Sequence, residues 1–110
     1  MTGNEYQKFA ARTINHNLSK CDQINHALFG MCGEVGELHS LYQKRFQGHT
    51  FEENDYKKEL GDLLWFIAEY CTANGWLLED IMKMNVTKLY KRYPEGFVEE
   101  CSIFRDESNE

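Results

Sequence analysis

Two short acidic segments with the same pattern stand 25 positions apart in the chain. The segments Glu34–Leu38 and Glu59–Leu63 both read acid, apolar, glycine, acid, leucine. On an α-helix, acids at positions i and i+3 lie about 60° apart on one face. Carboxylate oxygens favour hard cations such as Mg²⁺, Mn²⁺ or Ca²⁺, so the repeated pattern predicts a metal site. Its expected ligands are Glu34, Glu37, Glu59 and Asp62.

The apolar neighbours of these acids strengthen the interpretation. On a helical wheel, each pair lies in or beside the stripe that should face a core, where an unpaired carboxylate is costly. Four acids brought together repel one another unless a cation or protonation relieves them. The alternative is that the acids face solvent at a helix edge, which is usual for a single pair. The repeated glycines, Gly36 and Gly61, suggest that a neighbouring helix or a ligand approaches the backbone closely.

The histidines argue against di-iron chemistry, which uses Glu-x-x-His pairs in helical bundles. None of the four histidines has a glutamate three residues before it, and they show no other ligand spacing. We expect them to lie at the surface or behind the site residues. They are His16, His26, His39 and His49.

A basic strip near the C-terminal end complements the acids. Asn85, Lys88 and Arg92 share one face of an expected helix, where they would clamp phosphate oxygens beside a bound metal. A solvated basic face at a helix C-terminus is the competing interpretation.

Composition indicates one all-α domain. The 110 residues include one proline, and 12 basic residues against 18 acidic ones give a net charge of −6, which argues against nucleic-acid binding. The four cysteines form no CxxC pair, so we expect no zinc or redox motif, and we expect free thiols in a reducing cytoplasm without a disulfide framework. The N-terminal residues lack a hydrophobic signal region, and the longest apolar run is too short to span a membrane. We therefore expect a cytoplasmic protein that does not act on membranes.

Capping signals predict three helices, and two acids at 79–80 with a proline at 94 mark the start and end of a fourth. Asn4 with Gln7, Ser19 with Asp22, and Thr50 with Glu53 mark three helix starts, while Gly48 and Gly75 mark two ends. The expected helices cover about 4–14, 22–47, 51–74 and 79–93, and the short link between the second and third makes them antiparallel neighbours. This fold is an antiparallel bundle of about four helices, completed by oligomerisation. We expect a domain over 1–97 and an acidic tail over 98–110.

These residues resemble the signatures of the MazG-like all-α nucleoside triphosphate pyrophosphohydrolases. The acids match a Glu-x-x-Glu, linker, Glu-x-x-Asp pattern, and the basic strip continues into the family's Arg-Tyr-Pro ending at 92–94. The resemblance implies cleavage of a nucleoside triphosphate, often a deoxynucleotide, to the monophosphate and pyrophosphate. It assigns Mg²⁺, or Mn²⁺, to the four acids and phosphate binding to Asn85, Lys88 and Arg92. It also implies a homodimer or homotetramer.

Glu37 is the acid that we expect to activate the attacking water, because it lies at the edge of the apolar stripe. Related dUTPases and phosphoribosyl-ATP pyrophosphatases are alternatives within the same group. A helical interaction module whose acidic face engages a basic partner, without catalysis, is an alternative of another class.

Overall fold

The computed structural model describes residues 1–100, so most of the expected acidic tail, 98–110, lies outside the described residues. The described part contains four α-helices and no β-strand, which confirms the all-α prediction. The helices are α1 (Gly3–Ala11), α2 (Lys20–Phe46), α3 (Glu53–Asn74) and α4 (Leu78–Arg92). The chain divides into two compact units. The first spans Met1–Leu77, and the second begins at Leu78 and contains α4.

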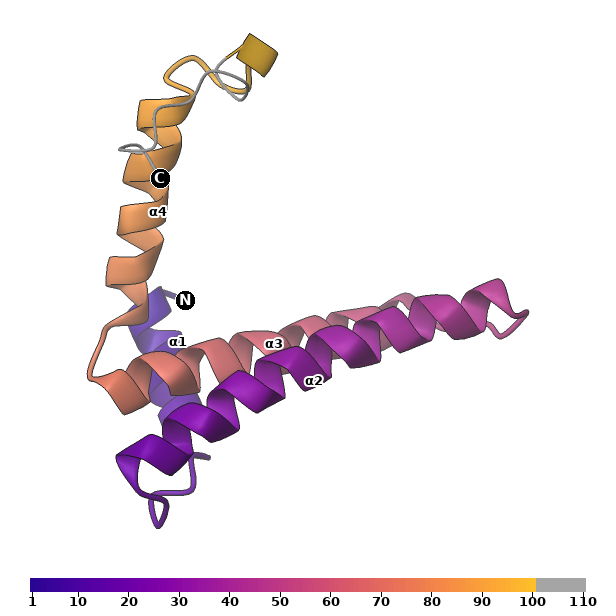
Figure 1. The fold of residues 1–110 in the computed structure, drawn as a ribbon, viewed down its shortest axis with the longest axis horizontal. Helices are drawn as coiled ribbons and strands as arrows, with labels where there is room; N and C mark the ends of the chain where they lie inside the picture. Colours follow the sequence, from indigo (N-terminus) through magenta and orange to yellow (C-terminus); the bar gives the residue numbers. More distant parts are fainter. Residues whose placement is uncertain (101–110) are drawn as a thin grey trace. The chain divides into compact units, whose positions relative to one another are not determined.

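α2 and α3 form the antiparallel hairpin that the sequence predicts (Figure 1). α2 begins after Ser19, whose hydroxyl oxygen accepts a hydrogen bond of 3.1 Å from the Asp22 N–H. Gly48, just beyond its end, has a φ of 102°, and Gly75 ends α3 in the left-handed region with a φ of 73°. Only glycine adopts this region at no steric cost, so these two positions fix where the helices stop.

The caps of α1 and α3 differ from the prediction. Thr2, and not Asn4, caps α1, because its hydroxyl oxygen accepts a bond of 3.1 Å from the Glu5 N–H. Glu52, and not Thr50, caps α3, and its N–H donates to the Asp55 carboxylate over 2.9 Å. The residue before this cap, Phe51, packs edge-to-face on Tyr56 with ring centres 6.5 Å apart. This hydrophobic staple sets the start of α3 two residues later than a Thr50 cap would.

Small residues allow α2 and α3 to pack closely. Ala27 and Ala68 are completely buried, and a side chain at Gly30 would collide with the Phe66 ring. Gly36 and Gly61 differ from Gly30, since a β-carbon at either would meet nothing within 4 Å. The close helix contact within the described chain is therefore at Gly30, outside the repeated acidic pattern.

α1 packs against α3 through polar anchors as well as apolar ones. The Gln7 side-chain amide donates to the Thr72 hydroxyl oxygen over 3.1 Å and to the Trp76 carbonyl over 2.9 Å. The Trp65 indole N–H lies 2.8 Å from the Thr13 hydroxyl oxygen and 3.2 Å from the Ala10 carbonyl oxygen. These bonds attach α1 to the hairpin.

No described helix combines the length and apolarity needed to cross a bilayer.

Candidate metal centre

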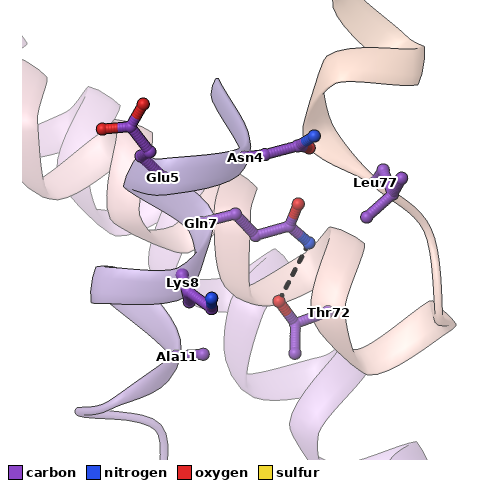
Figure 2. Close-up of a pocket in the computed structure, with 7 residues that line it drawn as sticks. All are labelled: Asn4, Glu5, Gln7, Lys8, Ala11, Thr72 and Leu77. Atoms are coloured by element: carbon purple, nitrogen blue, oxygen red, sulfur yellow. Dashed lines mark hydrogen bonds between the residues drawn. The ribbon is translucent and has the colours of Figure 1, made fainter. Parts of the chain in front are cut away.

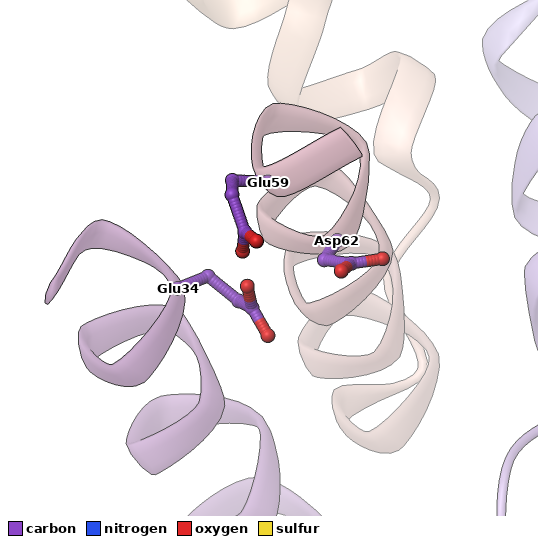
Figure 3. Close-up of side chains that lie close together, drawn as sticks. All are labelled: Glu34, Glu59 and Asp62. Atoms are coloured by element: carbon purple, nitrogen blue, oxygen red, sulfur yellow. The ribbon is translucent and has the colours of Figure 1, made fainter. Parts of the chain in front are cut away.

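Three of the four predicted ligands meet across the hairpin. Glu34 extends from α2 toward Glu59 and Asp62 of α3, and one carboxylate oxygen from each lies within 4.8 Å of the other two (Figure 3). The antiparallel pairing of the helices and the i, i+3 spacing on α3 produce this grouping. We call these three residues the acid cluster.

The acid cluster leaves one buried oxygen without compensation. Glu34 Oε2 is buried and has no hydrogen-bond partner among the described residues. A hydrogen bond with Glu59 raises the pKa of Glu34 to about 7, with further contributions from burial and from the charges of Asp62, Glu59 and Glu37. Two carboxylates form such a bond only if one of them keeps a proton. The site therefore favours bound positive charge, either a proton or a cation.

The donor set fits a hard divalent cation. Mg²⁺ and Ca²⁺ bind oxygens at about 2.0–2.6 Å, so oxygens that share one ion lie within about 5 Å of each other. The acid cluster meets this condition. In the described part of the chain, no lysine, arginine or histidine forms an ion pair with its members.

Glu37 lies outside this group of three. It is exposed on α2, one turn beyond Glu34, and its charge contributes to the raised pKa of Glu34. It is therefore near the acid cluster and open to solvent.

The predicted phosphate-binding residues lie on α4, in the second unit. Asn85 is exposed, whereas Lys88 and Arg92 are partly buried. Arg92 Nε and Nη2 are buried without a hydrogen-bond partner among residues 1–100, and the Arg92 guanidinium carbon lies 6.0 Å from the centre of the Tyr93 ring. The acid cluster and this basic strip lie in different units, so each is described by itself.

A second buried carboxylate was not recognised from the sequence. Glu69 of α3 is completely buried, and its two carboxylate oxygens lie 2.8 and 3.0 Å from Nδ1 of His26 on α2. Because an ionised carboxylate only accepts hydrogen bonds, Nδ1 carries the proton in this pair. His26 is half-exposed and packs against the Trp65 and Phe66 rings. The only sequence signal was an acid within the apolar stretch 63–71.

A cavity of about 390 Å³ lies beside α1 (Figure 2). Its lining includes Gln7 and Thr72, which are bonded to each other, and a single acid, Glu5. This cavity therefore lies where α1 packs against α3. It lacks the grouped carboxylates that a metal site needs.

The chain is an all-α domain whose antiparallel helices bring three carboxylates to one point, an arrangement whose oxygens fit a divalent cation. The model of the MazG nucleotide pyrophosphohydrolase domain matches residues 23–97, a segment that contains both the acid cluster and the basic strip. The chain therefore belongs to the MazG nucleotide pyrophosphohydrolase domain family.

A relative is known from a virus. The chain is 29% identical over 103 residues to the Gene 37 protein of Mycobacterium phage L5, and the match covers 86% of this chain and 90% of that protein. No solved structure matches the chain. The family supports nucleotide pyrophosphohydrolase activity in general.

Proposed function

We propose that this protein hydrolyses a nucleoside triphosphate, most readily a deoxynucleotide, to the nucleoside monophosphate and pyrophosphate in the presence of Mg²⁺. The acid cluster carries the proposal, because three carboxylates around one buried and uncompensated oxygen favour a bound cation. Family membership adds the class of substrate.

The proposed roles follow from charge and exposure. Glu34, Glu59 and Asp62 hold Mg²⁺ with the help of Glu37, and Mn²⁺ suits the same oxygens. The bound ion supplies polarisation of the phosphate and charge neutralisation for the leaving pyrophosphate. Glu37 orients or deprotonates the attacking water, since it is exposed to solvent beside the acid cluster.

The basic strip would bind the phosphates. Lys88 and Arg92 neutralise the triphosphate, and Asn85 fixes its orientation by hydrogen bonding. Arg92 supports this role, because its buried and unpartnered nitrogens are suited to phosphate oxygens.

We also propose that the protein acts as a homodimer or homotetramer. Several large apolar side chains on the hairpin are exposed in the single chain, and a second copy would cover them. They include Phe29, Val35, Leu60 and Leu64.

A substrate screen tests the proposed activity. Each common dNTP and NTP is incubated with the protein and Mg²⁺, and the release of pyrophosphate and orthophosphate is followed. We expect pyrophosphate from at least one nucleotide and none when EDTA replaces Mg²⁺. Orthophosphate as the product would overturn cleavage between the α- and β-phosphates. The absence of turnover with every nucleotide would favour the helical interaction module.

The basic strip is tested by Lys88→Ala and Arg92→Ala. Losing preorganised charge stabilisation should lower kcat/KM by on the order of 10²-fold in each variant, while far-UV circular dichroism stays unchanged. Lys91→Ala is the matched control, because Lys91 is an exposed lysine on the same helix. Normal kinetics in both test variants would show that the strip is a solvated helix face.

A further inference from the structure

A cavity of about 590 Å³ lies at the end of the hairpin, where α2 stops and α3 begins. We call it the hairpin-end cavity. Its volume falls within the range of about 300–1,000 Å³ that is usual for small-molecule sites. Its lining combines aromatic and basic side chains with one acid, Glu53; the aromatic and basic members are Tyr42, Phe51, Tyr56, Arg45, His49 and Lys57.

Local structure holds the aromatic part of this lining in place. Phe51 and Tyr56 form the hydrophobic staple that starts α3, and Tyr42 of α2 packs on Tyr56 with ring centres 5.1 Å apart. Tyr42 of α2 and Phe51, just before α3, therefore both pack on the Tyr56 ring. The three rings are therefore positioned before any ligand arrives, which reduces the ordering cost of binding.

The chemistry of the lining suits a flat, aromatic and electron-rich ligand. Tyr42 is 55% exposed as a residue, so part of its ring is open for stacking. Arg45 has no acidic partner among the described residues, whereas Lys57 pairs with Glu53 over 3.2 Å. This unpaired guanidinium lines the same cavity as the aromatic rings, and it favours an anionic ligand such as a nucleotide.

The Tyr56 hydroxyl provides a second, independent sign of a ligand. It is buried and has no hydrogen-bond partner in the described part of the chain. A buried polar group that is left unsatisfied destabilises the free protein, and a ligand that bonds to it removes this cost. A nucleobase carries carbonyl, ring-nitrogen and amino groups, each of which would bond to this hydroxyl.

The hairpin-end cavity lies near the acid cluster along α3. Tyr56 precedes Glu59 by three residues, which is roughly 4.5 Å along the helix axis. Leu60, the residue after Glu59, also lines the cavity. Side chains on a helix lean toward its N-terminus, so Glu59 leans toward the Tyr56 end of α3. A nucleotide with its phosphates at the acid cluster can therefore extend its nucleoside part in this direction.

We propose that the hairpin-end cavity binds the nucleobase of the substrate, with the base stacked on Tyr42 and hydrogen-bonded to the Tyr56 hydroxyl. This proposal rests on the proposed function for the position of the phosphates. The binding of a base in the cavity can be measured without turnover.

The first experiment measures binding of dAMP, dCMP, dGMP and dTMP to the full chain in EDTA by NMR titration. For the monophosphate that binds tightest, Tyr42→Leu should weaken binding by roughly tenfold or more, the effect of losing one stacked base. Tyr56→Phe removes only the hydroxyl and should weaken binding by roughly threefold to tenfold. The matched controls are Phe9→Leu, an exposed aromatic on α1, and Tyr70→Phe, which packs on Trp76; neither residue lines the cavity.

The second experiment follows turnover with Mg²⁺. Both test variants should raise KM for the preferred triphosphate and keep kcat within a few-fold. Inhibition by inorganic tripolyphosphate, which has no base, should be unchanged in them. Unchanged KM and unchanged monophosphate binding in both variants would overturn the proposal. If the parent hydrolyses no triphosphate, the proposed function fails, and the titrations alone then decide whether the cavity binds a base.

Discussion

Two glutamates of the α2–α3 hairpin are shielded from solvent, and the groups around their carboxylates differ. Glu69 is completely buried, yet both of its oxygens lie within hydrogen-bond distance of the protonated Nδ1 of His26. Glu34 is less buried, but its neighbour is another acid, and one of its oxygens has no partner among the described residues. The two sites lie on the same pair of helices.

The difference shows how a structural acid can be told from a candidate metal ligand. The presence of a hydrogen-bond donor beside the carboxylate separates the two more clearly than burial does. A buried carboxylate that accepts a hydrogen bond from a neighbouring side chain needs no ligand to satisfy its oxygens. A partly buried carboxylate that faces other acids is repelled by their charges until a proton or a cation binds between them. The comparison therefore predicts opposite consequences for stability when His26 is removed at one site and a carboxylate charge is removed at the other.

The largest effect is expected at the compensated pair. His26→Ala would leave the Glu69 carboxylate buried and unpaired, and breaking a buried pair costs about 3–5 kcal/mol. We expect about 3 kcal/mol in the free energy of unfolding, because His26 is half-exposed and water can enter. Denaturant unfolding at pH 7 in EDTA measures the change.

The double variant His26→Leu with Glu69→Leu is the control for this prediction. Because it removes both partners and leaves no buried carboxylate, it should recover most of the lost stability. A His26→Ala protein as stable as the parent would show that the pair contributes little, and the contrast between the two sites would disappear.

At the acid cluster we expect the reverse pattern. Glu34→Gln and Glu59→Gln each remove one repelling charge and keep the shape, so the EDTA-treated protein should melt no lower than the parent. Mg²⁺ should raise the melting temperature of the parent by mass action, and less in either variant. Turnover should fall by on the order of 10²-fold or more.

Thermal melts with and without Mg²⁺, beside pyrophosphate-release assays, measure both parts. Variants that melt earlier and hydrolyse nucleotide normally would assign these acids to the fold.

A smaller effect should appear in the pH dependence of stability without metal. The pKa of Glu34 rises to about 7 in the folded protein from a usual value of 4.5. Between these values the unfolded chain releases this proton while the folded chain keeps it, so Glu34 makes stability fall as pH rises from about 4.5 to about 7. Above about 7 both states have released the proton, and this contribution stops changing.

Melting temperatures of the parent and of Glu34→Gln in EDTA from pH 4.5 to 8 isolate this contribution. The parent should lose more stability than the variant over that interval. Parallel curves would contradict the raised pKa and would leave Glu34 resembling an ordinary surface acid.

The features that the sequence predicts correctly are local or follow from one short link. Ser19, Gly48 and Gly75 act on backbone groups a few residues away, so the bounds of α2 and the end of α3 are predicted closely. The short link then brings Glu34 opposite Glu59 and Asp62.

The features that the sequence does not reveal depend on the register between the helices. His26 and Glu69 are 43 residues apart, and no spacing rule connects them. The tight contact lies at Gly30 because Phe66 happens to face it, which the repeated glycines of the acidic pattern do not indicate. The start of α3 depends on the Phe51–Tyr56 packing, which outweighs the threonine signal at position 50.

Gly30 lies one helical turn before Glu34, and Phe66 one turn after Asp62, so their contact sets the separation of α2 and α3 next to the acid cluster. Gly30→Ala would force the helices apart or displace the ring, and the carboxylate oxygens would move apart with the helices. Because Ca²⁺ accepts longer oxygen distances than Mg²⁺, the variant should be stabilised less by Mg²⁺ and relatively more by Ca²⁺ in thermal melts. Discrimination by ionic radius would then depend on a residue that contributes no ligand atom.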